Sequence, residues 1–140
     1  SLAYIDSSIK NLRVFYFDLY AFTTIDSKEQ ARASSYQYYV AANVQLSKAV
    51  SASLQLEGRD GYQYAYYFDE ESGNSNLLHA SLEYTLNDFT LTLWMRNILD
   101  ENYPIQGLYF GNDPTDNFAT NLYTQAGEPR NAGVNLRFSF

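Results

Sequence analysis

The sequence predicts an all-β fold, an antiparallel up-and-down meander of about six strands. Apolar and polar side chains alternate with period two over most of the chain, while helical spacing is poor throughout. The connections between the alternating stretches are short and long in turn. Because successive strands of a meander run in opposite directions, all short turns should lie at one edge of the sheet and all long connections at the other.

Each alternating stretch is expected to form one strand. The expected strands cover residues 13–24, 36–47, 50–67, 76–86, 89–97 and 131–140. Tight turns are expected at 47–50 and 87–88, and long connections at 25–35, 68–75 and 98–130. Strands of this length suit the roughly 9–11 residues with which a tilted strand crosses a bilayer, so the layout favours a transmembrane barrel with short turns on one side and long loops on the other.

The composition excludes several classes of function. The net charge of −7 argues against a nucleic-acid partner or anionic lipid, since both require a basic surface. The absence of Cys excludes disulfides, thiolate nucleophiles and Cys-based metal sites. The apolar runs are far shorter than the roughly 20 residues of a transmembrane helix. The 14 Tyr and 9 Phe residues favour positions at a boundary between apolar and aqueous surroundings.

No constellation of residues points to catalysis. His79 is the only histidine, and the chain has neither a nucleophile elbow nor a Gly-rich phosphate loop. Loop carboxylates can bind Ca²⁺, but those of this chain lack the full ligand spacing of a calcium loop and are expected to be solvated. These carboxylates are Asp69, Glu70, Glu71, Asp113 and Asp116. We therefore expect no catalytic residue, no metal site and no cofactor, and a protein that is not an enzyme.

Alternation alone is also typical of a soluble sheet that buries its apolar face. Two features beyond the sorted turn lengths favour the membrane barrel: charged side chains in mid-strand on the polar face, and a final strand that runs to Phe140. The charged side chains are Glu57, Arg59, Glu83, Arg96 and Arg137. A cluster of aromatic residues near the expected loops would form the outer aromatic girdle of such a barrel. Its members are Tyr36, Tyr38, Tyr62, Tyr64, Tyr66, Tyr67 and Phe68. In a soluble protein the same residues would pack over a sheet or contact a ligand.

Two short motifs carry a family resemblance. The first is an Asn-apolar-x-Asp-x-x-Tyr segment formed by Asn97, Asp100 and Tyr103. The second is a Gly-x-Pro-Arg segment formed by Gly127, Pro129 and Arg130, which leads into the final alternating strand and Phe140. In this order and spacing the chain resembles the C-terminus of TonB-dependent outer-membrane receptors. The resemblance is sharp over about residues 76–140 and generic before them.

The resemblance implies a 22-stranded transmembrane barrel in the outer membrane of a Gram-negative bacterium. That barrel would be filled by an N-terminal plug and powered by TonB, and it would import a scarce nutrient. An iron-siderophore complex is the first expectation, with cobalamin, haem or an oligosaccharide as further cargoes. Residues 1–140 would be the C-terminal part of the barrel domain, without the plug domain and the TonB-binding segment, so the chain is expected to be a piece of a larger polypeptide. Its partners would be the TonB system, outer-membrane lipid and the barrel assembly machinery.

Three groups of residues are candidates for function. Asn97, Asp100 and Tyr103 either orient the long connection through hydrogen bonds to the backbone or merely end a strand, and the second, structural role is the favoured one. Arg130 either pairs with a loop carboxylate or is solvated. The long connection is also the expected contact region for a small-molecule or metal-chelate ligand, through Tyr109, Phe110, Asn112 and Tyr123. The resemblance further implies that Leu136, Phe138 and Phe140, in the final strand, serve as the assembly signal.

Two other classes of protein remain open at this stage. A soluble secreted or periplasmic β-sheet binding module would bury the apolar faces as its core. A small adhesin or structural barrel would need about eight strands and would not explain the two motifs. If the chain is isolated from a larger barrel, its open edges and apolar face are expected to drive self-association.

Overall fold

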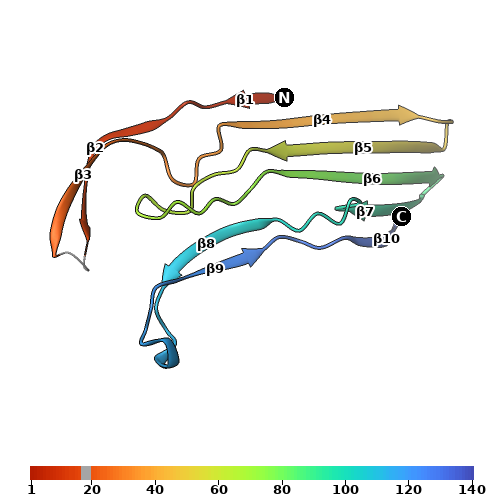
Figure 1. The fold of residues 1–140 in the computed structure, drawn as a ribbon. Helices are drawn as coiled ribbons and strands as arrows, with labels where there is room; N and C mark the ends of the chain where they lie inside the picture. The colour runs from red at the N-terminus through yellow and green to blue at the C-terminus, as the bar shows by residue number, and fades with distance from the viewer. Residues whose placement is uncertain (17–19) are drawn as a thin grey trace.

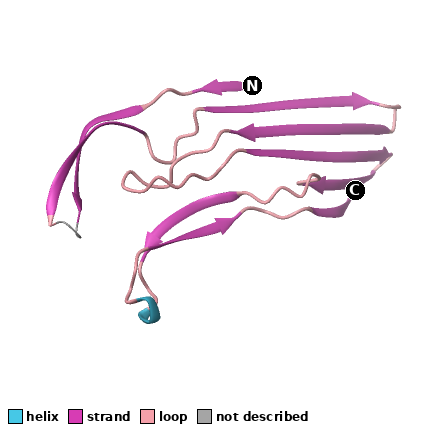
Figure 2. Ribbon diagram, in the orientation of Figure 1, coloured by secondary structure: helices cyan, strands magenta, loops and turns pink. Residues whose placement is uncertain are grey.

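A computed structural model, which describes residues 1–16 and 20–140, shows an antiparallel β architecture (Figures 1 and 2). Its main feature is a six-stranded sheet in the order β1-β4-β5-β6-β7-β10. The strands are β1 (Leu2–Tyr4), β4 (Tyr36–Gln45), β5 (Val50–Arg59), β6 (Ser75–Leu86), β7 (Phe89–Arg96) and β10 (Asn131–Phe138). The predicted all-β antiparallel fold is confirmed, and β1 and β10 form the two edges of this sheet.

The connections within the sheet are sorted by length, as predicted. The β4–β5 turn is closed by the Ser47 hydroxyl, which accepts hydrogen bonds from the amides of Ala49 (3.2 Å) and Val50 (3.1 Å). The β6–β7 turn places Asn87 at φ 51°, a left-handed conformation that Asn tolerates well. Val50 pairs with Tyr84, so both turns lie at the same edge. We call this edge the turn end and the opposite edge the loop end. The three long links, β1–β4, β5–β6 and β7–β10, all lie at the loop end (Figure 1).

Two hairpins are inserted in the long links at the loop end. The first, β2 (Ser8–Tyr16) and β3 (Ala21–Glu29), follows β1. The second, β8 (Pro104–Phe110) and β9 (Asn121–Ala126), lies between β7 and β10 and carries the short 3-10 helix η1 (Pro114–Asp116) at its tip. We call this second unit the distal hairpin. In Figure 1 both hairpins extend away from the turn end.

The predicted first strand, over residues 13–24, is wrong. Its described residues belong to β2 and β3, which pair with each other, and residues 17–19 lie outside the described part of the chain. Both hairpin strands carry period-two alternation, and no Gly or Pro separates them, so the pattern reads as one strand. The sheet strand in this position is β1, whose three residues are too few to show a period.

Two further expectations need correction. The predicted strand over residues 50–67 ends at Arg59, and Asp60 closes the local turn by accepting a hydrogen bond from the Gly61 amide (2.9 Å). The connection over residues 98–130 was expected to be a loop, but it contains the distal hairpin. The final predicted strand pairs with β7 as far as Phe138; the Ser139 amide still reaches the Asp88 carbonyl, and Phe140 is fully exposed.

The strand register collects the apolar side chains on one face of the sheet. One row runs through Val44, Ala52, Leu82, Leu93 and Val134. The adjacent row, on the opposite face, runs through Asn43, Ser53, Ser81, Trp94 and Gly133. We call these the apolar face and the polar face. The predicted alternation is therefore confirmed as a single face that continues across five strands.

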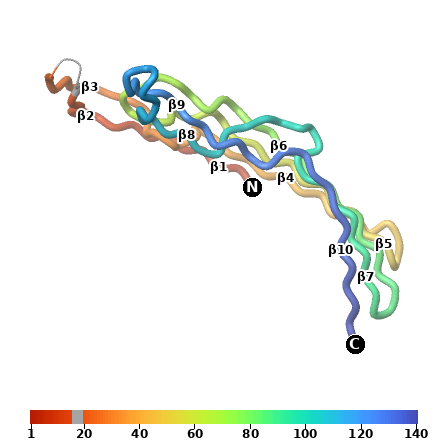
Figure 3. Tube along the Cα trace, turned by 90° about the horizontal axis from the view of Figure 1, so that it is seen from below, coloured from red at the N-terminus to blue at the C-terminus, as the bar shows by residue number. Residues whose placement is uncertain are grey.

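The apolar face has no covering layer within the described residues. Val44, Leu93 and Val134 are 53%, 43% and 60% exposed. All contacting pairs of described strands are neighbours within a sheet, and Figure 3 shows the six-stranded sheet as one thin curved layer. The buried hydrophobic residues of the described chain are Val14, Tyr62, Tyr64 and Leu77. None of the described helices is long and apolar enough to cross a membrane.

Aromatic residues border the apolar face at both ends. At the loop end, Tyr4 pairs with Tyr36, and Tyr38 lies one pleat further along β4. At the turn end, Phe89 pairs with Phe138, with ring centroids 5.1 Å apart. The predicted girdle is thus only partly matched: Tyr36 and Tyr38 lie on this face, whereas its other members lie in the loop after β5, where Tyr62 and Tyr64 are buried.

Candidate functional site

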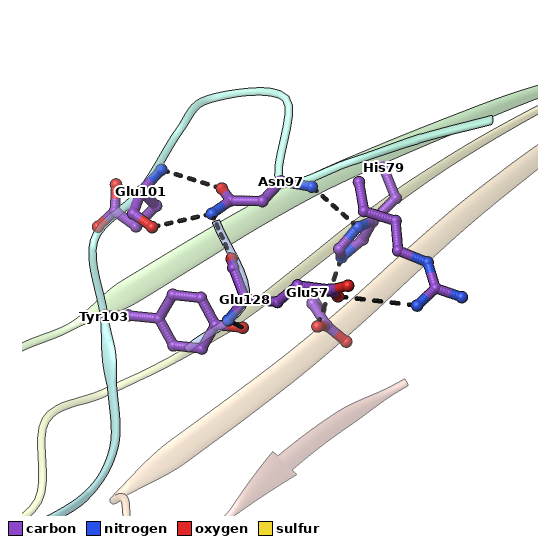
Figure 4. A network of polar contacts seen from close by, with 7 residues as sticks. Glu57, His79, Asn97, Glu101, Tyr103 and Glu128 are labelled. Carbon is purple, nitrogen blue, oxygen red and sulfur yellow. Dashed lines mark hydrogen bonds and ion pairs between the residues drawn. The ribbon is translucent and has the colours of Figure 1, made fainter. Parts of the chain in front are cut away.

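The first motif residue, Asn97, connects both ends of the distal hairpin. It directly follows β7 at φ 46° and has the largest fully buried side chain of the described chain. Its amide nitrogen donates to the carbonyls of Glu101 (2.9 Å) and Glu128 (3.0 Å), while its amide oxygen accepts from the Glu101 backbone N–H (2.9 Å). One side chain therefore joins the segment that enters the distal hairpin to the segment that leaves it (Figure 4).

The motif residues Asp100 and Arg130 make a second connection between the same two segments. The Asp100 carboxylate accepts a hydrogen bond from the Arg130 backbone N–H (3.3 Å). It also forms an ion pair with the Arg130 guanidinium (3.3 Å). Asp100 itself is left-handed at φ 56°, and its amide donates to the Asn97 carbonyl (2.9 Å). The two alternatives left open for Arg130 are thereby decided in favour of the loop carboxylate.

Tyr103 and Gly127 make the third connection. The Gly127 amide donates to the Tyr103 carbonyl (2.7 Å), and the Tyr103 hydroxyl accepts from the Glu128 amide (3.3 Å). The Tyr103 ring lies directly against the Gly127 Cα, so a Cβ at position 127 would overlap the ring. Glycine is therefore required here by the close approach of the ring. We call the residues that make these three connections the junction network. They are Asn97, Asp100, Glu101, Tyr103, Gly127, Glu128 and Arg130.

The junction network is attached to the polar face of the sheet. The backbone N–H of Asn97 donates to His79 Nδ1 (3.3 Å) on β6, and His79 Nε2 lies 3.5 Å from the Glu57 carboxylate on β5. The Arg96 guanidinium lies 3.7 Å from the Glu128 carboxylate. These contacts fix the base of the distal hairpin to three strands of the sheet (Figure 4).

The sequence motifs identified most of this network. All but one of the six motif residues contact another member; Pro129 instead offers its carbonyl to the Asn131 side chain (3.2 Å). Sequence reasoning did not identify Glu101 and Glu128 as members of the network, nor His79 as its partner on the sheet. Glu101 and Glu128 take part through backbone groups, which no side-chain pattern shows; His79 is brought to Asn97 by the β6–β7 register.

The four predicted ligand-contact residues do not form one surface. The Phe110 and Tyr123 rings stack at 4.4 Å, and the Tyr123 hydroxyl donates to the Asn112 side chain (2.7 Å). Tyr109 lies on the opposite side of β8, because successive side chains of a strand alternate. There it stacks on Phe68 at 3.8 Å and donates to the Glu70 carboxylate (2.8 Å).

Tyr109 and its neighbours fasten the distal hairpin to the β5–β6 loop. Burial, followed by the hydrogen bond to Glu70, raises the pKa of the Tyr109 phenol well above its ordinary value. The Tyr62 hydroxyl donates to the Ile105 carbonyl (2.8 Å), and the Tyr64 ring lies against Gly107. These aromatic side chains therefore hold the distal hairpin and the β5–β6 loop together.

The loop carboxylates serve the local structure. Asp113 Oδ1 accepts hydrogen bonds from the amide (2.8 Å) and hydroxyl (2.6 Å) of Thr115, which lower the pKa of Asp113. Asp116 accepts from the Asn121 side chain (2.7 Å), and Asp69 pairs with Lys28 (2.9 Å). Within residues 1–16 and 20–140, no three His, Cys, Asp or Glu side chains are placed to hold a metal ion.

Comparison with known proteins adds no relative to this picture. No family model matches the chain, and no curated protein and no solved structure matches it either.

Proposed function

We propose that the six-stranded sheet is part of the wall of a transmembrane β-barrel in the outer membrane of a Gram-negative bacterium. The observation that supports this most directly is the apolar face. It continues in register over five strands, and no described element covers it. A soluble single-layer sheet with such a face would expose a large contiguous apolar patch to water, which soluble proteins avoid.

The dimensions of the sheet suit a bilayer. β4 and β5 have 10 residues each, β6 has 12, and β7 and β10 have 8. A tilted strand needs roughly 9–11 residues to cross a membrane. The aromatic residues that border the apolar face at both ends lie where rings favour the headgroup region. In this orientation the polar face lines the barrel interior.

The resemblance in the two motifs extends the proposal to a TonB-dependent receptor that imports a scarce nutrient. In this proposal the junction network holds the distal hairpin at the outer mouth of the barrel, where ligand is first met. The full 22-stranded barrel, the plug and the TonB system would belong to the complete receptor. As an edge strand with an apolar stripe, β10 would be the segment that the assembly machinery recognises.

Opposite faces of β10 offer a matched test of the membrane proposal. In the full-length protein, Val134→Arg would place a cation on the apolar face, whereas Asn135→Arg would place the same cation on the polar face. A cation at the midplane of the lipid face costs about 2–4 kcal/mol in outer-membrane barrels. We expect Val134→Arg to lower strongly the amount of protein in alkali-washed outer membranes, and Asn135→Arg to leave it near the parental amount.

The soluble binding module makes the opposite forecast. A parent protein that is released from cells without detergent and stays monomeric in buffer would overturn the membrane proposal. Equal membrane amounts for Val134→Arg and Asn135→Arg would overturn it as well, because lipid would then not contact the apolar face.

A further inference from the structure

We infer that the tip of the distal hairpin binds a neutral saccharide. This inference rests on the proposed function, because it names the class of nutrient that the receptor would take. The site consists of Phe110, Asn112, Phe118 and Tyr123, and we call it the tip site. Its aromatic rings, its amide and the charge around it each suit such a ligand.

The tip site presents aromatic surface to solvent. The Phe110 and Tyr123 rings lie 4.4 Å apart at an interplanar angle of 21°, and these residues are 43% and 40% exposed. Phe118, at the end of the turn that follows η1, is 60% exposed. Flat rings of this kind suit the C–H faces of a sugar ring, because aromatic π-faces carry partial negative charge and the C–H edges of a sugar carry partial positive charge.

The backbone of the tip is held in an unusual conformation around these rings. Asn117 and Phe118 are both left-handed, at φ 60° and φ 58°, which is uncommon for a bulky side chain. The Phe118 amide donates to the Asp113 carbonyl (2.9 Å), and the Ala119 amide donates to the Asp116 side chain (3.1 Å). Local strain of this kind concentrates at ligand sites, where the surrounding structure maintains it.

The tip site also has a fixed polar group. The Tyr123 hydroxyl donates to Asn112 Oδ1 (2.7 Å), so this bond uses the acceptor of the amide and leaves its two N–H donors to other partners. An oriented amide beside aromatic rings can donate to sugar hydroxyls while the rings stack on the sugar. Tyr123 therefore contributes both a ring and the orientation of its polar neighbour.

The charge around the tip site selects a neutral ligand. Residues 104–126 contain two carboxylates, Asp113 and Asp116, and no Lys or Arg. On the opposite side of β8, the β5–β6 loop that Tyr109 fastens to the hairpin adds Asp60, Glu70 and Glu71, and Asp69, which pairs with Lys28. An anionic ferric catecholate would be repelled by this surface, whereas an uncharged saccharide loses nothing by approaching it.

The test uses the full-length protein in detergent and isothermal titration calorimetry. The probes are neutral malto-, xylo- and chito-oligosaccharides, with a ferric tris-catecholate as the anionic comparison. We expect at least one neutral series to bind, and Phe110→Ala and Tyr123→Ala each to weaken its binding by about tenfold or more. Thr124→Ala, which changes the opposite side of β9, should bind like the parent; resistance of each variant to trypsin shows that the hairpin is folded.

The inference would be overturned if none of the neutral series bound. Binding of the ferric tris-catecholate that depends on Phe110 and Tyr123 would overturn it too. The outcome is separate from that of the membrane test. If the protein binds saccharide but Val134→Arg and Asn135→Arg reach the membrane in equal amounts, the tip site is supported and only the barrel proposal is contradicted.

Discussion

Asn97 shows how one side chain can determine the geometry of a long insertion. Its amide makes three hydrogen bonds to backbone groups of residues 101 and 128, and its own left-handed backbone redirects the chain at the end of β7. The sequence reveals Asn97 because Asn favours local side-chain-to-backbone bonds at strand ends. The sequence does not reveal that Asn97 bonds to Glu128. The acceptor is a backbone carbonyl 31 positions away, and every residue type carries such a carbonyl.

Replacing Asn97 tests this role. Asn97→Ala leaves buried backbone groups without partners, at roughly 1–3 kcal/mol for each unsatisfied group, so the base of the distal hairpin should loosen. We expect faster protease cleavage between β7 and β10, with unchanged cleavage elsewhere. Asn102→Ala, an exposed Asn in the same segment, is the control; equal cleavage rates in the two variants would contradict the assigned role.

Gly127 offers a second test at the scale of one atom. In Gly127→Ala the added methyl group would overlap the Tyr103 ring, so the ring and the segment after β9 must move apart. We expect the same loosening of the hairpin base, measured by the same cleavage. Adding Tyr103→Ala removes the ring that the methyl group would overlap, so cleavage of the double variant should fall part of the way back toward the parental rate. A Gly127→Ala variant with parental cleavage would show that the close approach of Tyr103 to Gly127 is not needed.

Among the elements, the β2–β3 hairpin shows where sequence patterns mislead. Period two is a property of every strand, so alternation cannot tell a strand of the main sheet from a strand of an inserted hairpin. β4, β6 and β7 were predicted closely, because tight turns mark the β4–β5 and β6–β7 boundaries. β5 was predicted too long, since its end is followed by a long loop, and β1 was missed because three residues show no period. The distal hairpin was missed because its strands are short and their two faces are not consistently apolar and polar.

The contact between the distal hairpin and the β5–β6 loop should depend on pH. Burial and the hydrogen bond to Glu70 raise the pKa of Tyr109 above the ordinary 10.0. The neutral phenol is the bound form, so the contact is complete below pH 10 and is lost as the pH rises from 10 through the raised pKa of Tyr109. We expect cleavage of the distal hairpin by an alkali-tolerant protease to rise above pH 10 in the parent.

Tyr109→Phe provides the control for this prediction. It removes the ionisable hydroxyl and keeps the ring that stacks on Phe68. Its cleavage should lack the step above pH 10. The same step in both proteins would assign the change to another group.

At the scale of the whole molecule, the proposed function rests on the two different faces of the sheet. The alternation along each strand was visible in the sequence, and so was the sorting of turns and loops. The register that aligns apolar rows across five strands depends on long-range pairing, and the sequence suggests it only because a one-residue slip would move a whole strand's apolar set to the other face. The absence of a covering layer over that face among the described residues follows from the structure alone.

The most direct measurement is the depth-dependent quenching of a fluorophore by lipid-attached nitroxides, in the full-length protein in outer-membrane lipid. The chain has no Cys, so each introduced Cys carries the only label in this segment. The labelled positions are Val44, Leu93 and Val134 on the apolar face and Asn43, Thr92 and Asn135 on the polar face. We expect strong quenching at the first three positions and weak quenching at their immediate neighbours. Equal quenching on both faces, or none on either, would contradict a lipid-facing apolar face.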